Sequence, residues 1–189
     1  MHPEPEFFLS TSRLVLKPHT LANLPPLNAW FNNPELSYFD GDDPPRALLE
    51  TLDETRLTLD RMMNPSDPPH ILHYAVHKNL GDDLIGYGMI ANIDRYNRRC
   101  DLGLTLGEKN EWGKGYASEA LQAVIAYCYK QLKMNRLGAS MYEFNWRSIR
   151  LFEGLGFQRE GVLHQYVYKD GTFKDELQYC LLKEEVGLD

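Results

Sequence analysis

The residues best suited to do chemistry lie in a glycine-rich segment, Trp112-Gly113-Lys114-Gly115-Tyr116-Ala117. This segment follows a run typical of a β-strand, residues 100–106, and precedes a helical pattern. Glycine tolerates the positive φ angles of a tight loop and lets the backbone approach a ligand closely. The first N–H groups of a helix have no partner within the helix, and its dipole adds partial positive charge there. The segment therefore predicts a phosphate cradle, for which a cofactor carrying a pyrophosphate is the expected ligand.

This loop alone leaves two interpretations open. It lacks the G-x-G-x-x-G pattern of dinucleotide-binding folds, and Lys114 lies between the glycines rather than before the Ser or Thr of a Walker loop. A tight structural turn that binds nothing is an equal alternative on this segment by itself.

A second segment, Asn145-Trp146-Arg147-Ser148-Ile149-Arg150-Leu151-Phe152-Glu153-Gly154-Leu155-Gly156-Phe157, decides between them. Together the two segments resemble the GNAT superfamily of acyl-CoA N-acyltransferases, with its Q/R-x-x-G-x-G/A loop and its N-x-x-S-x-x-L-F/Y-x-x-x-G-F motif. The start Thr11–Pro18 and the tail, with Glu160-Gly161 and then matches from Tyr168 to Tyr179, are similar to the RimJ/RimL-type branch, which includes N-terminal acetyltransferases of ribosomal proteins. The resemblance covers residues 10–184.

The resemblance implies a fold and an activity. The fold is α/β (α+β): a GNAT-like mixed, mostly antiparallel central sheet with splayed central strands, flanked by helices. It forms a single N-acetyltransferase domain over residues 10–185, after an N-terminal tail of residues 1–9. The implied activity is transfer of acetyl from acetyl-CoA directly to a primary amine in a ternary complex. The acceptor is a protein N-terminus or a small-molecule amine, and a homodimer is compatible with this branch.

The resemblance also implies which residues contact coenzyme A. They lie at the end of the strand, in the loop and in the second segment: Leu104, Thr105, Leu106, Trp112, Gly113, Lys114, Gly115, Tyr116, Ala117, Ser118, Asn145, Ser148, Arg150 and Leu151. The strand residues would use main-chain groups, so core packing of the leucines is compatible with this role. Trp112 replaces the usual Gln or Arg of the loop. Lys114 and Arg150 are candidates for the cofactor phosphates, or ordinary solvated cations.

Acyl transfer to an amine requires a base for the amine proton, and Asp101 is the first candidate. Some GNAT members place a glutamate base at this position of the strand. Alternation puts Asp101, Gly103 and Thr105 on one face. A salt bridge to Arg98, Arg99 or another cation is the structural alternative, and Glu119 is a weaker candidate for the base.

The leaving thiolate needs a proton, and Ser148 is the candidate catalytic residue near the sulfur. Asn145 would hydrogen-bond the cofactor arm. Alternatively, both residues merely cap a short helix. Phe152 stands where the family often has a tyrosine acid, so the proton falls to Ser148, a water or solvent. This departure keeps a second function open, a non-catalytic acyl-CoA-binding sensor on the same scaffold.

The acceptor groove is expected opposite the cofactor, between the helical region 20–60 and the hairpin 157–180. Its candidate substrate-binding residues, with Phe39 and His164 as neighbours, are Tyr38, Asp40, Tyr87, Tyr142 and Tyr166. An aromatic and acidic pocket suits an amine through cation–π contact. The sequence does not identify the amine.

The composition narrows the function classes. A chain of 189 residues suits one domain with one core. Its net charge of −7 argues against nucleic-acid binding and is compatible with a cationic substrate. No apolar run reaches the ~20 residues of a membrane span. Three scattered cysteines show no metal-ligand spacing, so we expect no metal and a cytoplasmic protein with free thiols.

The spacing of apolar residues predicts the elements that position these side chains. The expected strands cover residues 13–17, 70–78, 84–93, 100–106, 136–142, 157–168 and 172–183. The expected helices cover residues 21–31 and 46–63, the stretch from Ala117 to Leu132, and residues 145–154. The last two strands form a hairpin about Asp170-Gly171.

Overall fold

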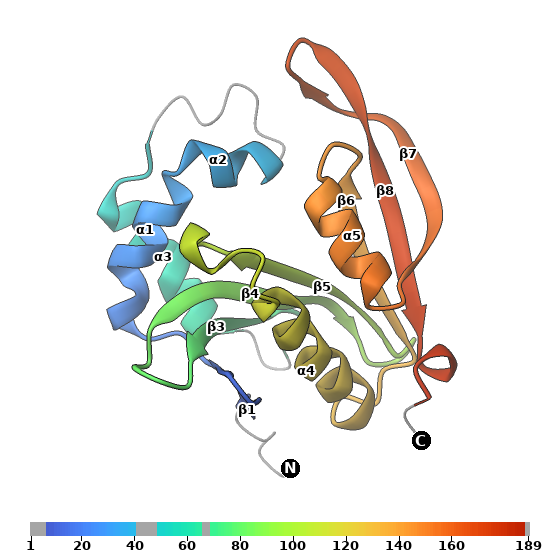
Figure 1. Cartoon of the computed structure of the whole chain (residues 1–189), viewed down its shortest axis with the longest axis horizontal. Helices are drawn as coiled ribbons and strands as arrows, with labels where there is room; N and C mark the ends of the chain where they lie inside the picture. Colours follow the sequence, from blue (N-terminus) through green and yellow to red (C-terminus); the bar gives the residue numbers. More distant parts are fainter. Residues whose placement is uncertain (1–6, 41–48, 66–68, 188–189) are drawn as a thin grey trace.

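A mixed sheet runs through the whole molecule (Figure 1). The structure is a computed structural model that describes residues 7–40, 49–65 and 69–187. The strands of these residues pair in the order β1-β2-β3-β4-β5-β6-β8-β7. Their bounds are β1 Leu9–Ser10, β2 Leu14–Lys17, β3 Leu72–Lys78, β4 Leu84–Asp94, β5 Arg99–Leu106, β6 Arg136–Tyr142, β7 Gln158–Lys169 and β8 Thr172–Leu182. Every neighbouring pair is antiparallel except β5 and β6, which confirms the predicted mixed, mostly antiparallel sheet.

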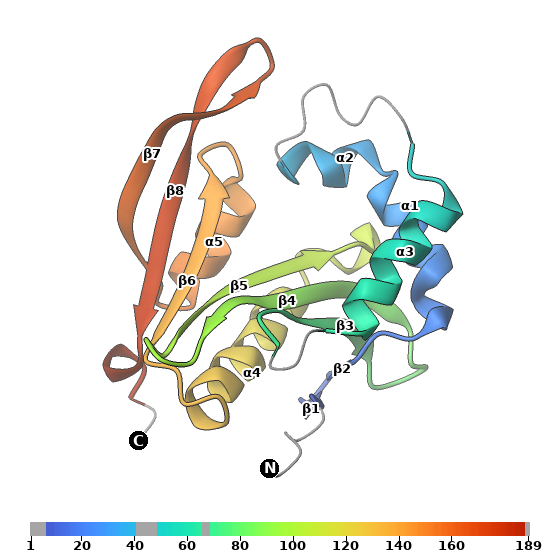
Figure 2. The same cartoon turned by 180° about the vertical axis from the view of Figure 1, so that it is seen from behind.

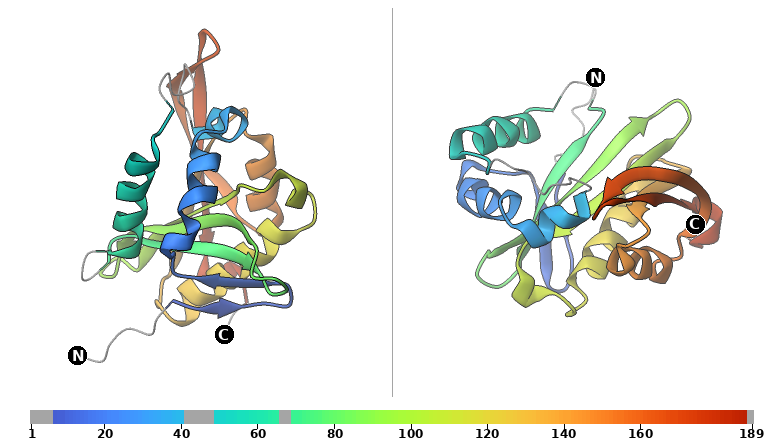
Figure 3. Two further views of the ribbon diagram at one scale, coloured as in Figure 1. Left: turned by 90° about the vertical axis from the view of Figure 1, so that its left-hand side faces the viewer. Right: turned by 90° about the horizontal axis from the view of Figure 1, so that it is seen from above.

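Helices cover both faces of the sheet. The longer ones are α1 Leu24–Phe31, α3 Leu52–Met63, α4 Tyr116–Lys130 and α5 Trp146–Gly154; the short ones are α2 Pro34–Ser37, η1 Leu21–Asn23, η2 Tyr38–Asp40, η3 Lys109–Glu111 and η4 Lys183–Glu185. α4 and α5 lie over one face and α3 over the other, with α1 packed against α3 (Figures 2 and 3). None of the described helices combines the length and apolar character needed to cross a bilayer.

The centre of the sheet opens between β5 and β6. These parallel strands pair at three positions, Arg99 with Arg136, Cys100 with Leu137 and Asp101 with Gly138. Beyond these positions β5 still pairs with β4, and β6 still pairs with β8, but β5 and β6 no longer pair with each other. β5 and β6 therefore diverge (Figure 2). The predicted splayed central strands are therefore present, and the wedge between them starts at Asp101.

The main core lies between α4 and the sheet. Leu121, Val124 and Cys128 follow helical spacing and are fully buried against strand residues such as Leu14 and Leu137. Burying a side chain of this size contributes about 1.5–3 kcal/mol, so this face fixes how α4 crosses the strands. A smaller cluster holds α1 and α3 together: Leu27, Trp30, Leu36 and Leu59.

The start of one helix differs from the prediction. The predicted helix 46–63 begins only at Leu52, because Thr51 forms a capping box with Glu54 that defines the start; residues 46–48 lie outside the described part. At the N-terminus, Phe7 is buried against the rings of Tyr74 and Tyr127, at centroid distances of 5.2 and 5.0 Å. Phe7 thus belongs to the main core, while the predicted domain bounds of residues 10–185 stay a prediction.

Buried His19 makes the fold sensitive to acid. Its side chain is only 5% exposed, and neither ring nitrogen has a hydrogen-bond partner among the described residues. Burial lowers the pKa of His19 from 6.5 to about 4. Between the unfolded pKa of 6.5 and the folded pKa of about 4, the unfolded state binds more protons than the folded state. The free energy of unfolding therefore falls as the pH drops through this range.

We therefore expect the free energy of unfolding to fall by about 2 kcal/mol more between about pH 7.5 and pH 5 in the wild type than in His19→Leu. Urea titrations at the two pH values measure this difference. His70→Gln, a change at an exposed histidine, should keep the wild-type dependence. An unchanged dependence in His19→Leu would contradict the role of His19.

Candidate active site

The glycine-rich loop joins the end of β5 to the start of α4. Gly115 is the N-cap of α4 with φ 82°, and Gly113 has φ 74°. Both angles lie in the left-handed region that glycine adopts readily. No side chain of the described residues caps α4, and a Cβ added at Gly113 would meet no atom within 4 Å. The first backbone N–H groups of α4 thus have no side-chain cap among the described residues, as an anion cradle requires.

Neighbouring side chains fix the shape of this loop. The Trp112 indole N–H donates to the Leu106 carbonyl at 2.8 Å, which anchors the loop to the last residue of β5. Lys114 Nζ lies 2.9 Å from Glu111 Oε2, and Lys78 Nζ lies 3.0 Å from Glu111 Oε1. Hydrogen bonds from the two lysines lower the pKa of Glu111. The Lys114 ammonium is thus already ion-paired, and its predicted contact with phosphate stays a prediction.

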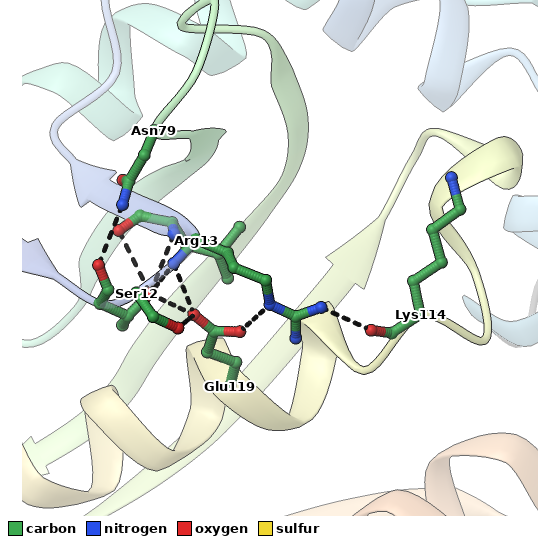
Figure 4. A network of polar contacts seen from close by, with 7 residues as sticks. Ser12, Arg13, Asn79, Lys114 and Glu119 are labelled. Atoms are coloured by element: carbon green, nitrogen blue, oxygen red, sulfur yellow. Dashed lines mark hydrogen bonds and ion pairs between the residues drawn. The ribbon is translucent and has the colours of Figure 1, made fainter.

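Glu119, in the first turn of α4, belongs to a network that joins α4 to the N-terminal strands (Figure 4). Its carboxylate accepts hydrogen bonds from the hydroxyls of Thr11 and Ser12 and from the Arg13 backbone and side chain. Burial favours the protonated form, but these bonds outweigh it and lower the pKa of Glu119 to about 2. A carboxylate held in this way is a poor proton acceptor, so the structure does not support Glu119 as the base.

The end of β5 forms one wall of the wedge. Leu104, Thr105 and Leu106 are half-buried and pair with β4 on one side only. Beyond Asp101 their other side has no strand partner among the described residues. Free backbone groups at a sheet edge accept an extended amide chain by strand addition. This edge therefore fits the amides of a pantetheine arm, and the cradle lies at the adjoining loop.

Asp101 lies where the wedge begins. Its Oδ2 accepts a hydrogen bond from the Asn92 side-chain amide at 2.7 Å. Its Oδ1 packs so closely over Gly138 of β6 that a Cβ there would clash with it. Arg99, a predicted structural partner, instead ion-pairs with Asp94 at 3.3 Å. Asp101 is exposed, so its carboxylate is held in place by a neutral donor and stays accessible.

The second motif segment forms the start of α5. Asn145 is its N-cap, and its side-chain oxygen accepts a hydrogen bond from the Ser148 backbone N–H at 3.2 Å. The capping alternative is therefore correct for Asn145, and it leaves the amide nitrogen available. Ser148 is half-buried, and Leu151 packs against the main core. The cofactor contacts of Asn145, Ser148 and Leu151 stay predictions.

An aromatic cluster lies on the expected acceptor side. Tyr38 packs on Phe144 at 5.3 Å, and Tyr142 stacks on Phe144 at 5.5 Å between centroids. The Tyr38 hydroxyl donates to Asp170 Oδ2 at 2.7 Å, and Lys169 Nζ lies 4.6 Å above the Tyr38 ring. The structure thus joins two predicted acceptor residues, Tyr38 and Tyr142, between η2, the end of β6 and the hairpin turn.

The remaining acceptor candidates lie elsewhere or are not described. Tyr87 packs between Trp30 and Phe31 in the smaller cluster under α1, at centroid distances of 6.1 and 5.7 Å. Tyr166 is 58% exposed on β7. Asp40 ends η2, but its side chain lies outside the described part. The aromatic cluster therefore gathers only part of the predicted set.

Residues 13–158 match the family described as the Acetyltransferase (GNAT) domain. The chain belongs to the GNAT family of acetyltransferases. The uncharacterized N-acetyltransferase p20 of Bacillus licheniformis is 31% identical over 177 residues, 94% of this chain and 97% of that protein. The ribosomal protein uS5-alanine N-acetyltransferase of Escherichia coli (strain K12) is 34% identical over 100 residues, 52% of this chain and 51% of that enzyme.

A solved structure shares the fold of this GNAT protein. It is spermidine N-acetyltransferase from Vibrio cholerae in complex with CoA and spermine, with a TM-score of 0.80, 19% identity and coverage of 93% of this chain and 99% of that one. It confirms the predicted fold. The family match and the N-acetyltransferase relatives confirm the predicted acetyltransferase activity.

Sequence reasoning missed one residue at the donor side of this GNAT domain. The Arg147 guanidinium lies 4.7 Å from the Trp112 ring centroid and 5.3 Å from that of Trp146. It thereby joins α5 to the glycine-rich loop across the wedge. The signal in the sequence was Trp112 itself, a flat ring at a position where the family usually has a polar side chain. Arg150 lies 5.2 Å from the Trp146 ring centroid, and its predicted phosphate contact stays a prediction.

Phe152 differs from the usual GNAT acid in its environment as well as its chemistry. It is buried and packs edge-on against Phe157 at a centroid distance of 5.0 Å. The ring thus serves the core beneath α5 and offers no proton to the site.

Proposed function

We propose that this GNAT protein transfers acetyl from acetyl-CoA directly to a primary amine in a ternary complex. One observation carries the proposal: β5 and β6 separate at Asp101, between an uncapped helix N-terminus and the aromatic cluster. A donor threaded through the wedge and an amine from the aromatic side would meet beside this carboxylate. Direct attack needs no covalent nucleophile on the protein.

The donor would be held mainly by backbone groups. The N–H groups of Gly115, Tyr116 and Ala117 would bind the pyrophosphate, because they lie at the positive end of the α4 dipole. The edge of Leu104–Leu106 that has no strand partner would pair with the pantetheine amides, although the Leu106 carbonyl already accepts from Trp112. When bound, acetyl-CoA supplies an acetyl group activated as a thioester.

Two side chains would handle protons. An amine is protonated near neutral pH and must lose a proton before it attacks. The Asp101 carboxylate would accept that proton, directly or through a water, while Asn92 holds its orientation. Ser148 Oγ, at the start of α5, would hold the proton that neutralises the leaving sulfur. Phe152 cannot supply it.

The acceptor would be a cationic amine, either a protein N-terminus or a small molecule. Rings such as Tyr38 and Tyr142 attract an ammonium group through their π faces, and the net charge of −7 favours its approach. Among the relatives, one acts on a ribosomal-protein alanine and one is a spermidine acetyltransferase. The buried free thiols Cys100 and Cys128 support a cytoplasmic location.

A panel of amines tests the proposal. We expect free thiol to appear from acetyl-CoA, above the acceptor-free rate, with peptides that begin with alanine or serine or with spermidine, and mass spectrometry should show one added acetyl group. Tight coenzyme A binding without turnover on any amine would instead favour the acyl-CoA sensor, the alternative that Phe152 keeps open. Absence of coenzyme A binding would exclude both functions.

A further inference from the structure

The Arg13 guanidinium contacts both the glycine-rich loop and the helix that follows it (Figure 4). Its Nη1 donates to the Lys114 carbonyl at 2.9 Å, and its Nε donates to Glu119 Oε2 at 2.5 Å. The same group lies 4.5 Å from the Tyr116 ring centroid. Arg13 comes from the segment that enters β2, a hundred residues before the loop in sequence. One side chain therefore holds three features of the cradle at once.

The contact with the Lys114 carbonyl sets the direction of a cradle N–H. A trans peptide is planar, so the Lys114 C=O and the Gly115 N–H point in opposite directions. With the carbonyl held on Arg13, the Gly115 N–H must point away from the Arg13 guanidinium. Glycine at 115, with φ 82°, can adopt either peptide orientation without a Cβ to bias it. An external hydrogen bond is therefore needed to select one.

Glu119 in turn fixes the guanidinium. Its Oε1 accepts from the Thr11 hydroxyl at 2.6 Å, the Ser12 hydroxyl at 3.0 Å and the Arg13 backbone N–H at 2.9 Å. Only Oε2 faces the Arg13 side chain. The carboxylate is thus locked by the turn before β2, and it presents one oxygen that orients the planar fork of Arg13.

We propose that Arg13 is a positioning residue for the donor site: oriented by Glu119, it holds the Lys114 carbonyl so that the Gly115 N–H faces the coenzyme A pyrophosphate. The inference rests on the proposed function, because it assumes that the loop binds this donor. Arg13 acts through the loop backbone and not by touching the cofactor. Lysine cannot replace it, because a single ammonium lacks the rigid fork that reaches Glu119 and the carbonyl together.

Glu119→Gln separates positioning from simple charge attraction. The glutamine oxygen can keep the three bonds of Oε1, while its NH2 group would face the Arg13 Nε–H as a second donor. The variant also removes a negative charge beside the cradle, so charge alone would strengthen coenzyme A binding. Loss of positioning would weaken it. The two explanations thus predict opposite signs.

The test is calorimetric titration of coenzyme A into the apo protein, with the melting temperature of each apo variant measured in parallel. We expect Glu119→Gln and Arg13→Lys to raise the Kd by about tenfold, the size expected for losing a charged hydrogen bond. The control is Lys17→Ala, which removes a β2 ion pair to Asp82 at 2.7 Å away from the loop. It should leave the Kd unchanged, whatever it does to the melting temperature.

Equal or tighter coenzyme A binding by Glu119→Gln would overturn the inference. Wild-type affinity in Arg13→Lys would also overturn it, because charge without the fork would then suffice. A wild-type protein that binds no coenzyme A would refute the proposed function itself. Failure of the inference therefore differs from failure of the function.

Discussion

Gly115→Glu is expected to weaken coenzyme A binding by about 100-fold or more, the combined effect of strain and of charge repulsion. Gly115 has φ 82° at the N-cap of α4, where a side chain strains the backbone. A glutamate there would also place a negative charge beside the N–H groups that are proposed to bind the pyrophosphate. A Cβ at this position lies 3.4 Å from Arg13 Nη2, so the new carboxylate would compete for that guanidinium as well.

Calorimetric titration with coenzyme A measures this loss, and Gly171→Glu provides a matched control. Gly171 also has a positive φ, 75°, and a Cβ there would meet no atom within 4 Å. The control therefore adds the same charge and similar strain at the β7–β8 turn, far from the loop. Gly115→Ala, which adds strain without charge, should fall between the wild type and the glutamate variant. Wild-type affinity in Gly115→Glu would refute the donor assignment of the loop.

Asp101→Asn is expected to lower kcat/KM by about 10²–10⁴-fold, the usual contribution of a general base. Asparagine keeps the shape of the side chain and can still pair with Asn92, but it cannot accept the amine proton. The affinity for coenzyme A should stay near the wild-type value, because the loop lies at the other end of β5. The pH profile of kcat/KM should change as well.

Two companion variants make this test specific. Asp94→Asn neutralises a carboxylate that accepts from Asn97 and Arg99 near the end of β4, and it should leave kcat/KM close to the wild-type value. Gly138→Ala keeps Asp101 but places a Cβ against its Oδ1, so it should lower kcat without altering coenzyme A affinity. If Asp101→Asn has the wild-type pH profile, Asp101 is not the base.

The backbone features of the proposed donor site could be predicted because their determinants are local. Positive φ at Gly113 and Gly115, free N–H groups at a helix start and apolar spacing along α4 depend on residues close together in the chain. The same holds for Asn145, whose side chain caps the helix that begins after it. The predicted start of α3 was wrong for a local reason too. The capping box of Thr51 and Glu54 starts the helix at Leu52, although the leucine spacing predicted a start at residue 46.

The acceptor side was harder to predict. The rings of Tyr38 and Tyr142 both pack on Phe144, which joins them into one cluster. Tyr87 packs against Trp30 in the smaller cluster under α1. Aromatic residues are common both in cores and in binding sites, so their type alone does not separate the two roles.

The sequence by itself determined the donor: a glycine loop before an amphipathic helix, followed by the Asn145–Phe157 motif. Tertiary structure alone decided how the site is held, through the separation of β5 and β6 at Asp101 and the bonds of Arg13 to Lys114 and Glu119. The physical reason is distance along the chain. Backbone torsions and helix dipoles arise within a few residues, whereas these contacts join segments that meet only when the sheet has formed.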